Sequence, residues 1–197
     1  MVRYELGKWN LDELAKNPNR KIVTKKLAKI ESDAKKFERI KKSLNPKVSS
    51  GKFLKLLHDV EDITEKSSVI GGYASLRYSE DTQSDEATAL LTRISKFGSD
   101  IENRLLFFDL WWKKQVDEKN ASRLIKSAGQ FSEYLRFKRL LAKYSLSEPE
   151  EKIINTLDVT GASALVKLYD KITNAYVYTV TVDGKKRTMN REQLTTL

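Results

Sequence analysis

The chain has no cysteine and a single histidine, so it carries neither a disulfide framework nor a thiolate metal site. His58 cannot form a zinc site by itself, and no H-E-x-x-H motif occurs anywhere in the sequence. Glycine (8 residues) and proline (3 residues) are scarce, whereas charged residues make up 32% of the chain. This balance is typical of long helices and excludes a loop-rich or disulfide-stapled fold.

Long apolar runs are also missing. In the longest, residues 105–112, seven of the eight side chains are large and apolar, but a membrane span needs ~20 such residues. The N-terminal residues lack the apolar core of a signal peptide. These absences predict a soluble, cytoplasmic protein with no membrane partner.

The apolar run ends a longer helical pattern over residues 82–114. Large or small apolar residues recur there at steps of three and four, at Ala87, Leu90, Ile94, Phe97, Ile101, Leu105, Phe108 and Trp112. A second apolar face joins near the end, at Leu106, Phe107, Leu110 and Trp111. A helix that is apolar nearly all round is a buried helix, so this segment is predicted to be the central helix, covered by the others.

Two polar features accompany this central helix. Thr82 and Asp85 have the spacing of a capping box at its start. Asp109 is the one acid inside the apolar run. Because a buried carboxylate needs a partner, we expect Asp109 to meet a lysine or arginine of a neighbouring helix, in preference to a catalytic role.

Other helices are predicted from the same spacing over residues 19–44, 49–78, 121–144, 147–157 and about 162–172. Ser147 and Glu150 form a capping box with proline between them. Gly71 and Gly72 fall inside the second helix, where they suggest a kink or a close helix crossing. His58 is expected on that helix, at the boundary between its apolar and its polar face.

Near the end of the chain, the period changes from helical to alternating. Residues 176–182 and 185–189 have the pattern of two strands, with a turn at Asp183-Gly184. Asn190 then caps a short helix with Gln193. The prediction is a mainly-α bundle of long antiparallel helices with a short β-hairpin near the C-terminus. Its domains would be a helical domain over 1–173 and, over 174–197, a hairpin and helix start leading into a further domain.

Several sequence blocks resemble oligoendopeptidase F, of the thimet-oligopeptidase class of zinc metallopeptidases. They are the blocks at residues 9–14, 73–82, 106–114, 134–136, 144–154 and 160–173. The resemblance runs in order over nearly the whole chain but covers only the N-terminal part of such a protein. The entry block includes Trp9, expected as an apolar anchor before a helical turn.

The resemblance implies a non-catalytic helical domain that forms part of the wall of a peptide channel. In the parent enzyme, zinc in a C-terminal catalytic domain would activate water to hydrolyse short peptides. Its ligands, on an H-E-x-x-H helix and a later glutamate, have no counterpart here. We therefore assign no catalytic, cofactor-binding or metal-binding residue to this chain, and expect the catalytic domain and short peptides as partners.

Charge offers an alternative. The net charge is +10, and residues 1–60 carry sixteen Lys/Arg against seven Asp/Glu, a net +9. A free-standing basic module binding nucleic acid or another acidic partner would use this charge. However, the spacing of the lysines in this region is typical of the solvent-exposed face of an amphipathic helix, as at lysines 25, 26, 29, 35, 36, 41 and 42. Because no recognition motif accompanies the charge, nucleic acid is not the expected partner. A third hypothesis is a purely structural helical protein with no enzyme attached.

Overall fold

The computed structural model describes residues 10–11, 14 and 20–196. The predicted anchor Trp9 lies outside the described residues. The helices are α1 (Arg20–Glu38), η1 (Arg39–Ser43), α2 (Ser50–Glu80), α3 (Asp85–Leu110), η2 (Trp111–Gln115), α4 (Glu118–Lys126), η3 (Gly129–Phe131), α5 (Ser132–Leu140), η4 (Leu141–Tyr144), α6 (Glu148–Thr160), α7 (Ala162–Asn174) and α8 (Arg191–Thr195). The strands are β1 (Tyr178–Val182) and β2 (Lys185–Met189).

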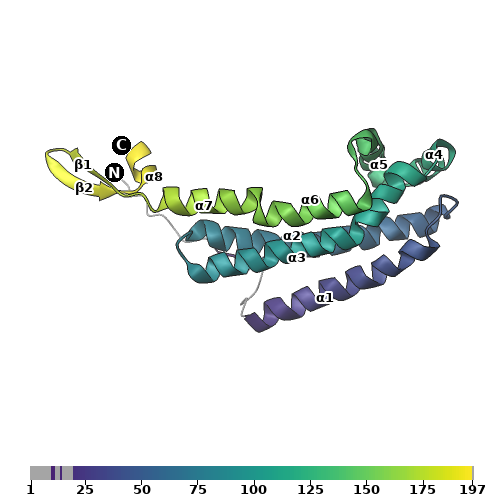
Figure 1. The fold of residues 1–197 in the computed structure, drawn as a ribbon, viewed down its shortest axis with the longest axis horizontal. Coiled ribbons are helices and arrows are strands. Elements are labelled where there is room, and N and C mark those ends of the chain that lie inside the picture. The colour runs from purple at the N-terminus through teal and green to yellow at the C-terminus, as the bar shows by residue number, and fades with distance from the viewer. Residues whose placement is uncertain (1–9, 12–13, 15–19, 197) are drawn as a thin grey trace.

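The long helices lie in three layers along an elongated molecule (Figure 1). α2 and α3 form an antiparallel pair in the middle, α1 packs against both, and α6 packs along α3 on the other side. α4 and α5 lie at one end of the molecule, and the β-hairpin lies at the other (Figure 1). The predicted helical bundle with a hairpin near its C-terminus is confirmed.

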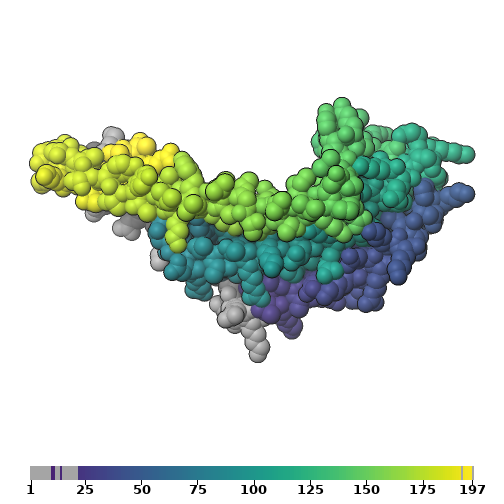
Figure 2. Space-filling model, in the orientation of Figure 1, coloured from purple at the N-terminus to yellow at the C-terminus, as the bar shows by residue number. Residues whose placement is uncertain are grey.

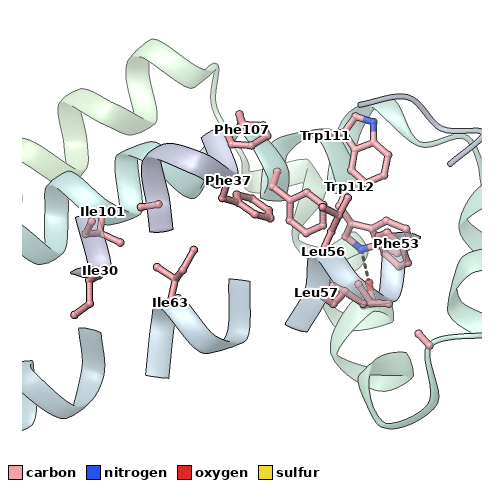
Figure 3. Close-up of a cluster of buried hydrophobic side chains, with 14 of the residues drawn as sticks. Ile30, Phe37, Phe53, Leu56, Leu57, Ile63, Ile101, Phe107, Trp111 and Trp112 are labelled. Carbon is pink, nitrogen blue, oxygen red and sulfur yellow. Dashed lines mark hydrogen bonds between the residues drawn. The ribbon is translucent and has the colours of Figure 1, made fainter. Parts of the chain in front are cut away.

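The core lies between α1, α2 and α3 and continues into η2 and α4. Its centre is a cluster of buried rings: Phe37, Phe53, Phe107, Phe108, Trp111 and Trp112. Figure 3 labels five of them, Phe37, Phe53, Phe107, Trp111 and Trp112. Phe53 stacks on Trp112 with 5.2 Å between ring centroids, and Phe108 stacks on Trp111 at 5.5 Å. Neighbouring aromatic rings gain about 0.5–1.5 kcal/mol beyond their burial, so this cluster fixes how the helices cross.

The predicted central helix corresponds to α3 followed by η2, a π-helical turn. Its burial is confirmed, since Trp111 and Trp112 are each 2% exposed. The predicted capping box of Thr82 and Asp85 is wrong. The helix begins at Asp85, and Ser84 caps it by accepting a hydrogen bond from the Ala87 amide at 3.2 Å.

Two other predictions on helices need correction. The single helix predicted over 121–144 is broken into α4, η3, α5 and η4, and Gly129 sits in the break with a φ of +57°. Glycine adopts that conformation without steric cost, and it lies three residues after α4 ends at Lys126. The close crossing predicted at Gly71 and Gly72 is also wrong, because a Cβ built on either residue meets no atom within 4 Å. α2 runs through both glycines as one helix.

The predicted capping boxes and β-hairpin near the C-terminus are confirmed, although the first strand begins at Tyr178 and not at residue 176. Ser147 and Glu150 form the capping box of α6, which extends to Thr160 and ends at Gly161. β1 and β2 pair antiparallel through the turn at Asp183-Gly184, with Tyr178 opposite Met189. Asn190 and Gln193 form the second capping box, at the start of α8.

Candidate functional site

The described residues offer no place for a catalytic metal. Within residues 10–11, 14 and 20–196, no group of three His, Cys, Asp or Glu side chains is placed to hold a metal ion. These residues therefore do not fit the zinc site that the resemblance implies for a parent enzyme. No helix in the described part of the chain is both long enough and apolar enough to cross a membrane.

His58 is an exposed surface residue on α2. Its Nδ1 lies 3.1 Å from Oε2 of Glu61, one turn further along the helix, and its ring meets Phe131 edge-on at 5.1 Å between centroids. This is the boundary position predicted from the sequence. Nothing in this arrangement assembles further ligands or a nucleophile around the imidazole.

Asp109 finds the cationic partners expected of a carboxylate in an apolar run. Its two oxygens lie 2.5 Å from Nζ of Lys113 and 3.0 Å from Nζ of Lys138, which comes from α5. Burial lowers the pKa of Lys138, but the charge of Asp109 and its hydrogen bond outweigh burial and hold that pKa above its usual value. The predicted contact of Asp109 with a lysine of a neighbouring helix is confirmed, and the carboxylate joins η2 and α5 to the end of α3.

A groove between α1, α3 and α6 also has charged walls. It encloses about 440 Å³ and is lined in part by Glu38, Arg104 and Lys152 over a floor of Phe97 and Ile101. Arg104 is bound to Glu38 at 2.7 Å, and Lys152 is bound to Glu148 at 2.8 Å. Because these cations are already paired with carboxylates of neighbouring or identical helices, the groove is interpreted as a packing interface between helices and not as a ligand site.

The side of α6 and α7 that faces the bundle is polar. The Asn155 carbonyl accepts a hydrogen bond from Ser99 at 3.0 Å, and the Asn155 side chain donates to Asn103 at 3.0 Å. Further along, the Tyr78 hydroxyl donates to the Lys167 carbonyl at 3.0 Å. Neither α6 nor α7 contains a fully buried residue. Hydrogen bonds, and not a shared apolar core, attach this layer to α2 and α3.

The opposite side of the same two helices is apolar and open. We call it the outer apolar face, made by Ile153, Ile154, Leu157, Leu165, Val166, Leu168, Tyr169 and Ile172. Each of these side chains is between 47% and 67% exposed. Figure 2 shows α6 and α7 as an uncovered strip, with the α5 end rising at one side and the hairpin extending at the other.

Other exposed apolar side chains lie on the segments before and after α6 and α7. They are Tyr134, Phe137, Leu140, Tyr144 and Leu146 in α5 and the residues that follow it, and Tyr176 and Val177 before the hairpin. Within the described part of the chain, every exposed large hydrophobic residue lies between residues 134 and 177. Large exposed apolar patches mark contact sites, so the outer apolar face is the candidate functional site.

The sequence pattern gave a partial signal for this site. It predicted helices carrying Leu165, Leu168, Tyr169 and Ile172 on one stripe, but a stripe does not reveal which side of the helix meets the bundle. The polar residues Asn155 and Lys167 could have indicated which side of these helices faces the bundle. They occupy the side that a buried helix would normally fill with apolar groups.

The same part of the chain matches a known family. Residues 114–177, 64 of the 197, match the family model for the N-terminal domain of M3 peptidases, described as Oligopeptidase F. No curated protein and no solved structure matches the chain. The matched segment runs from within η2 through α7 to Val177, just before β1, and includes the whole outer apolar face. The resemblance to the N-terminal domain of oligoendopeptidase F is thus confirmed over this segment, about a third of the chain.

Proposed function

We propose that this chain is the non-catalytic N-terminal domain of a zinc-dependent oligoendopeptidase, and that its outer apolar face packs against the catalytic domain. The proposal rests mainly on how polar and apolar side chains are distributed on α6 and α7, which is the reverse of the usual arrangement in a helical bundle. Polar side chains face the bundle, and large apolar side chains face outward. The family match covers these same helices, which makes a metallopeptidase domain the best-supported occupant of the face.

In this arrangement the helical domain supplies position and exclusion, and the catalytic domain supplies the chemistry. α6 and α7 would hold the domain against the catalytic half, and the elongated bundle would form part of the wall of a channel for short, flexible peptides. Burying the outer apolar face would stabilise the pair, at roughly 25 cal/mol for each Å² of apolar surface removed from water. Among the described residues, no three His, Cys, Asp or Glu side chains come together to hold a metal ion.

The test combines this chain with a separately produced zinc-peptidase domain of the same family and source. Binding is measured by titration, and turnover is measured with a quenched fluorescent peptide. The test variant is Leu165→Asp with Tyr169→Asp, which places two charges on the outer apolar face. The matched control is Ala28→Asp with Ser32→Asp, which places two equal charges on exposed positions of α1. All four sites are exposed, so we expect both variants to fold normally.

We expect the face variant to lose at least tenfold in binding to the catalytic domain, because charges would have to be buried in the contact. The α1 control should bind like the unchanged chain. Equal binding by both variants would remove the outer apolar face from the contact. Stoichiometric zinc, or peptide turnover by this chain alone, would contradict the non-catalytic role.

A further inference from the structure

The described basic residues between Lys25 and Lys55 differ in their surroundings. On α1, three lysines pair with acids of the same helix, among them Lys29 with Asp33 at 3.0 Å and Lys35 with Glu31 at 2.6 Å. These pairs agree with the predicted solvated helix face. Residues 39–57, which follow, contain six Lys or Arg and no acid. Their charge has no local compensation.

One of these six cations is neutralised from a distance, since Lys41 binds Glu148 at 2.7 Å. The other five form no ion pair with any described residue: Arg39, Lys42, Lys47, Lys52 and Lys55. All five are exposed. They lie on η1, on the connection to α2, and on the first two turns of α2. We call this region, together with α4, the basic tip.

α4 brings further cations to the same end of the molecule (Figure 1). Arg123 anchors it there by donating to the carbonyl oxygens of Pro46 at 3.2 Å and Val48 at 2.9 Å. Lys119 and Lys126 lie on the same face of α4 as Arg123, because the spacings are four and three residues. The acid that begins the helix, Glu118, is bound to Arg139.

The segments of the basic tip carry exposed charge but no exposed large hydrophobic side chain of their own. The exposed large hydrophobic side chains of the described residues all lie within 134–177, outside the tip. Protein contacts draw most of their energy from buried aromatic or arginine anchors, and surface helices bind membranes by burying an apolar face. Binding to nucleic acid can rest on phosphate contacts alone, with affinity supplied by the release of counterions. The chemistry of the tip therefore favours a phosphate backbone.

We propose that the basic tip binds duplex nucleic acid through its phosphates, without reading the bases. Within the tip, Arg39 and Lys42 lie one turn apart on η1, and Lys52 and Lys55 lie one turn apart on α2. Such rows of fixed positive charge suit a linear array of phosphates. No residue of the basic tip belongs to the outer apolar face, so the two interactions can be tested with different variants.

The experiment measures binding of the whole chain to a fluorescent 20-base-pair duplex of random sequence, by anisotropy, over a series of salt concentrations. The tip variant is Lys42→Gln, Lys52→Gln and Lys55→Gln together. The control variant is Lys25→Gln, Lys26→Gln and Lys186→Gln, which removes the same charge from exposed lysines away from the tip. Vesicles containing phosphatidylserine and a polyglutamate peptide serve as competing polyanions.

At low salt we expect the tip variant to bind the duplex at least tenfold more weakly than the unchanged chain, and the control variant to change by less than threefold. The slope of log affinity against log salt should fall by roughly 2 to 3 in the tip variant, at about 0.9 for each lost phosphate contact. Three results would overturn the proposal: no binding at low salt, equal losses in both variants, or tighter binding to vesicles or polyglutamate than to the duplex. None of these results bears on the outer apolar face, which both variants leave intact.

Discussion

Trp112 and Phe53 stack with 5.2 Å between ring centroids and 30° between ring planes, and Nε1 of Trp112 donates to the Leu135 carbonyl oxygen at 3.0 Å. One side chain thus joins α2, η2 and α5. The neighbouring Trp111 is equally buried, at 2% exposure, but its Nε1 forms no hydrogen bond with a described residue. The two indoles fill the same core, but only Trp112 adds a hydrogen bond to its packing.

This difference leads to the first prediction. Trp112→Ala and Trp111→Ala should each lower the free energy of unfolding by about 3–5 kcal/mol, the usual cost of emptying a large aromatic site. Trp112→Phe should cost more than Trp111→Phe, by about 1 kcal/mol. Only the first change removes a hydrogen bond and leaves the buried Leu135 carbonyl without it. Urea unfolding curves measure all four values.

An exposed residue provides the control for this comparison. Leu140 is 71% exposed, so Leu140→Ala should change the free energy of unfolding by less than about 0.5 kcal/mol. Equal costs for Trp112→Phe and Trp111→Phe would show that the hydrogen bond to Leu135 adds nothing to stability. An unchanged midpoint for both alanine variants would mean that the rings are not buried.

Much of this architecture follows from spacing and local chemistry. The apolar spacing of Val23, Leu27 and Ile30 predicts α1. Each of these side chains is buried in the structure. The alternation of residues 176–182 and the turn at Asp183-Gly184 predict the hairpin for a similar reason: strand period and turn geometry are short-range properties. These elements could be read from a few neighbouring residues.

The elements that were missed depend on competition or on distant contacts. Ser84 replaces Thr82 as the cap because both are good cap residues, and the pattern does not rank them. α4 ends at Lys126, and Gly129 lies in the break that follows, where the chain turns to bring α5 against η2. An isolated glycine within a helical stripe does not predict such a turn. The exposure of Leu165 and Tyr169 depends on what covers α7, which a local pattern does not contain.

The second prediction concerns the charge cluster at Asp109. Its side chain is 27% exposed, and those of Lys113 and Lys138 are 12% and 28% exposed. Asp109→Ala should lower the free energy of unfolding by about 1–3 kcal/mol, because two partly buried ammonium groups lose their counter-charge. In a Lys138→Met background the cost should be smaller, and a double-mutant cycle would measure this coupling.

A second ion pair serves as the control for Asp109. Asp62 pairs with Lys66 on α2, where the side chains are 54% and 43% exposed. Asp62→Ala should cost less than about 0.5 kcal/mol, because exposed pairs contribute little. If Asp109→Ala costs no more than Asp62→Ala, the Asp109 cluster is a surface feature and not a link between η2 and α5.

The third prediction concerns acid stability. Hydrogen bonds from Lys152 and from Lys41 hold the pKa of Glu148 below its usual value of 4.5. The unfolded chain therefore binds a proton at Glu148 at a higher pH than the folded chain does. The resulting stabilisation is present above pH 4.5 and is lost as the pH falls through the lower, folded-state pKa.

Glu148→Gln should remove this part of the pH dependence. Between pH 6 and 3, thermal unfolding midpoints of the variant should fall less steeply than those of the unchanged chain. At neutral pH the variant should be less stable by about 1 kcal/mol or less, as expected for a partly exposed pair. Glu102→Gln, on the exposed side of α3, should leave the steepness unchanged. Parallel curves for Glu148→Gln and the unchanged chain would contradict this linkage.

The last prediction compares two glycines. A Cβ built on Gly161 would lie 2.8 Å from the Leu157 carbonyl oxygen, which also accepts a hydrogen bond from the Gly161 amide at 2.7 Å. Gly161→Ala should therefore force the α6–α7 junction to shift and cost about 1–3 kcal/mol. Gly71 lies inside α2, and a Cβ there would meet no atom within 4 Å. Gly71→Ala should stabilise the protein by about 0.5–1 kcal/mol, since alanine loses less backbone entropy in a helix. Thermal unfolding of the two variants measures both effects, and a change of the same sign in both would show that helix propensity, and not the close approach at Leu157, decides the cost at the junction.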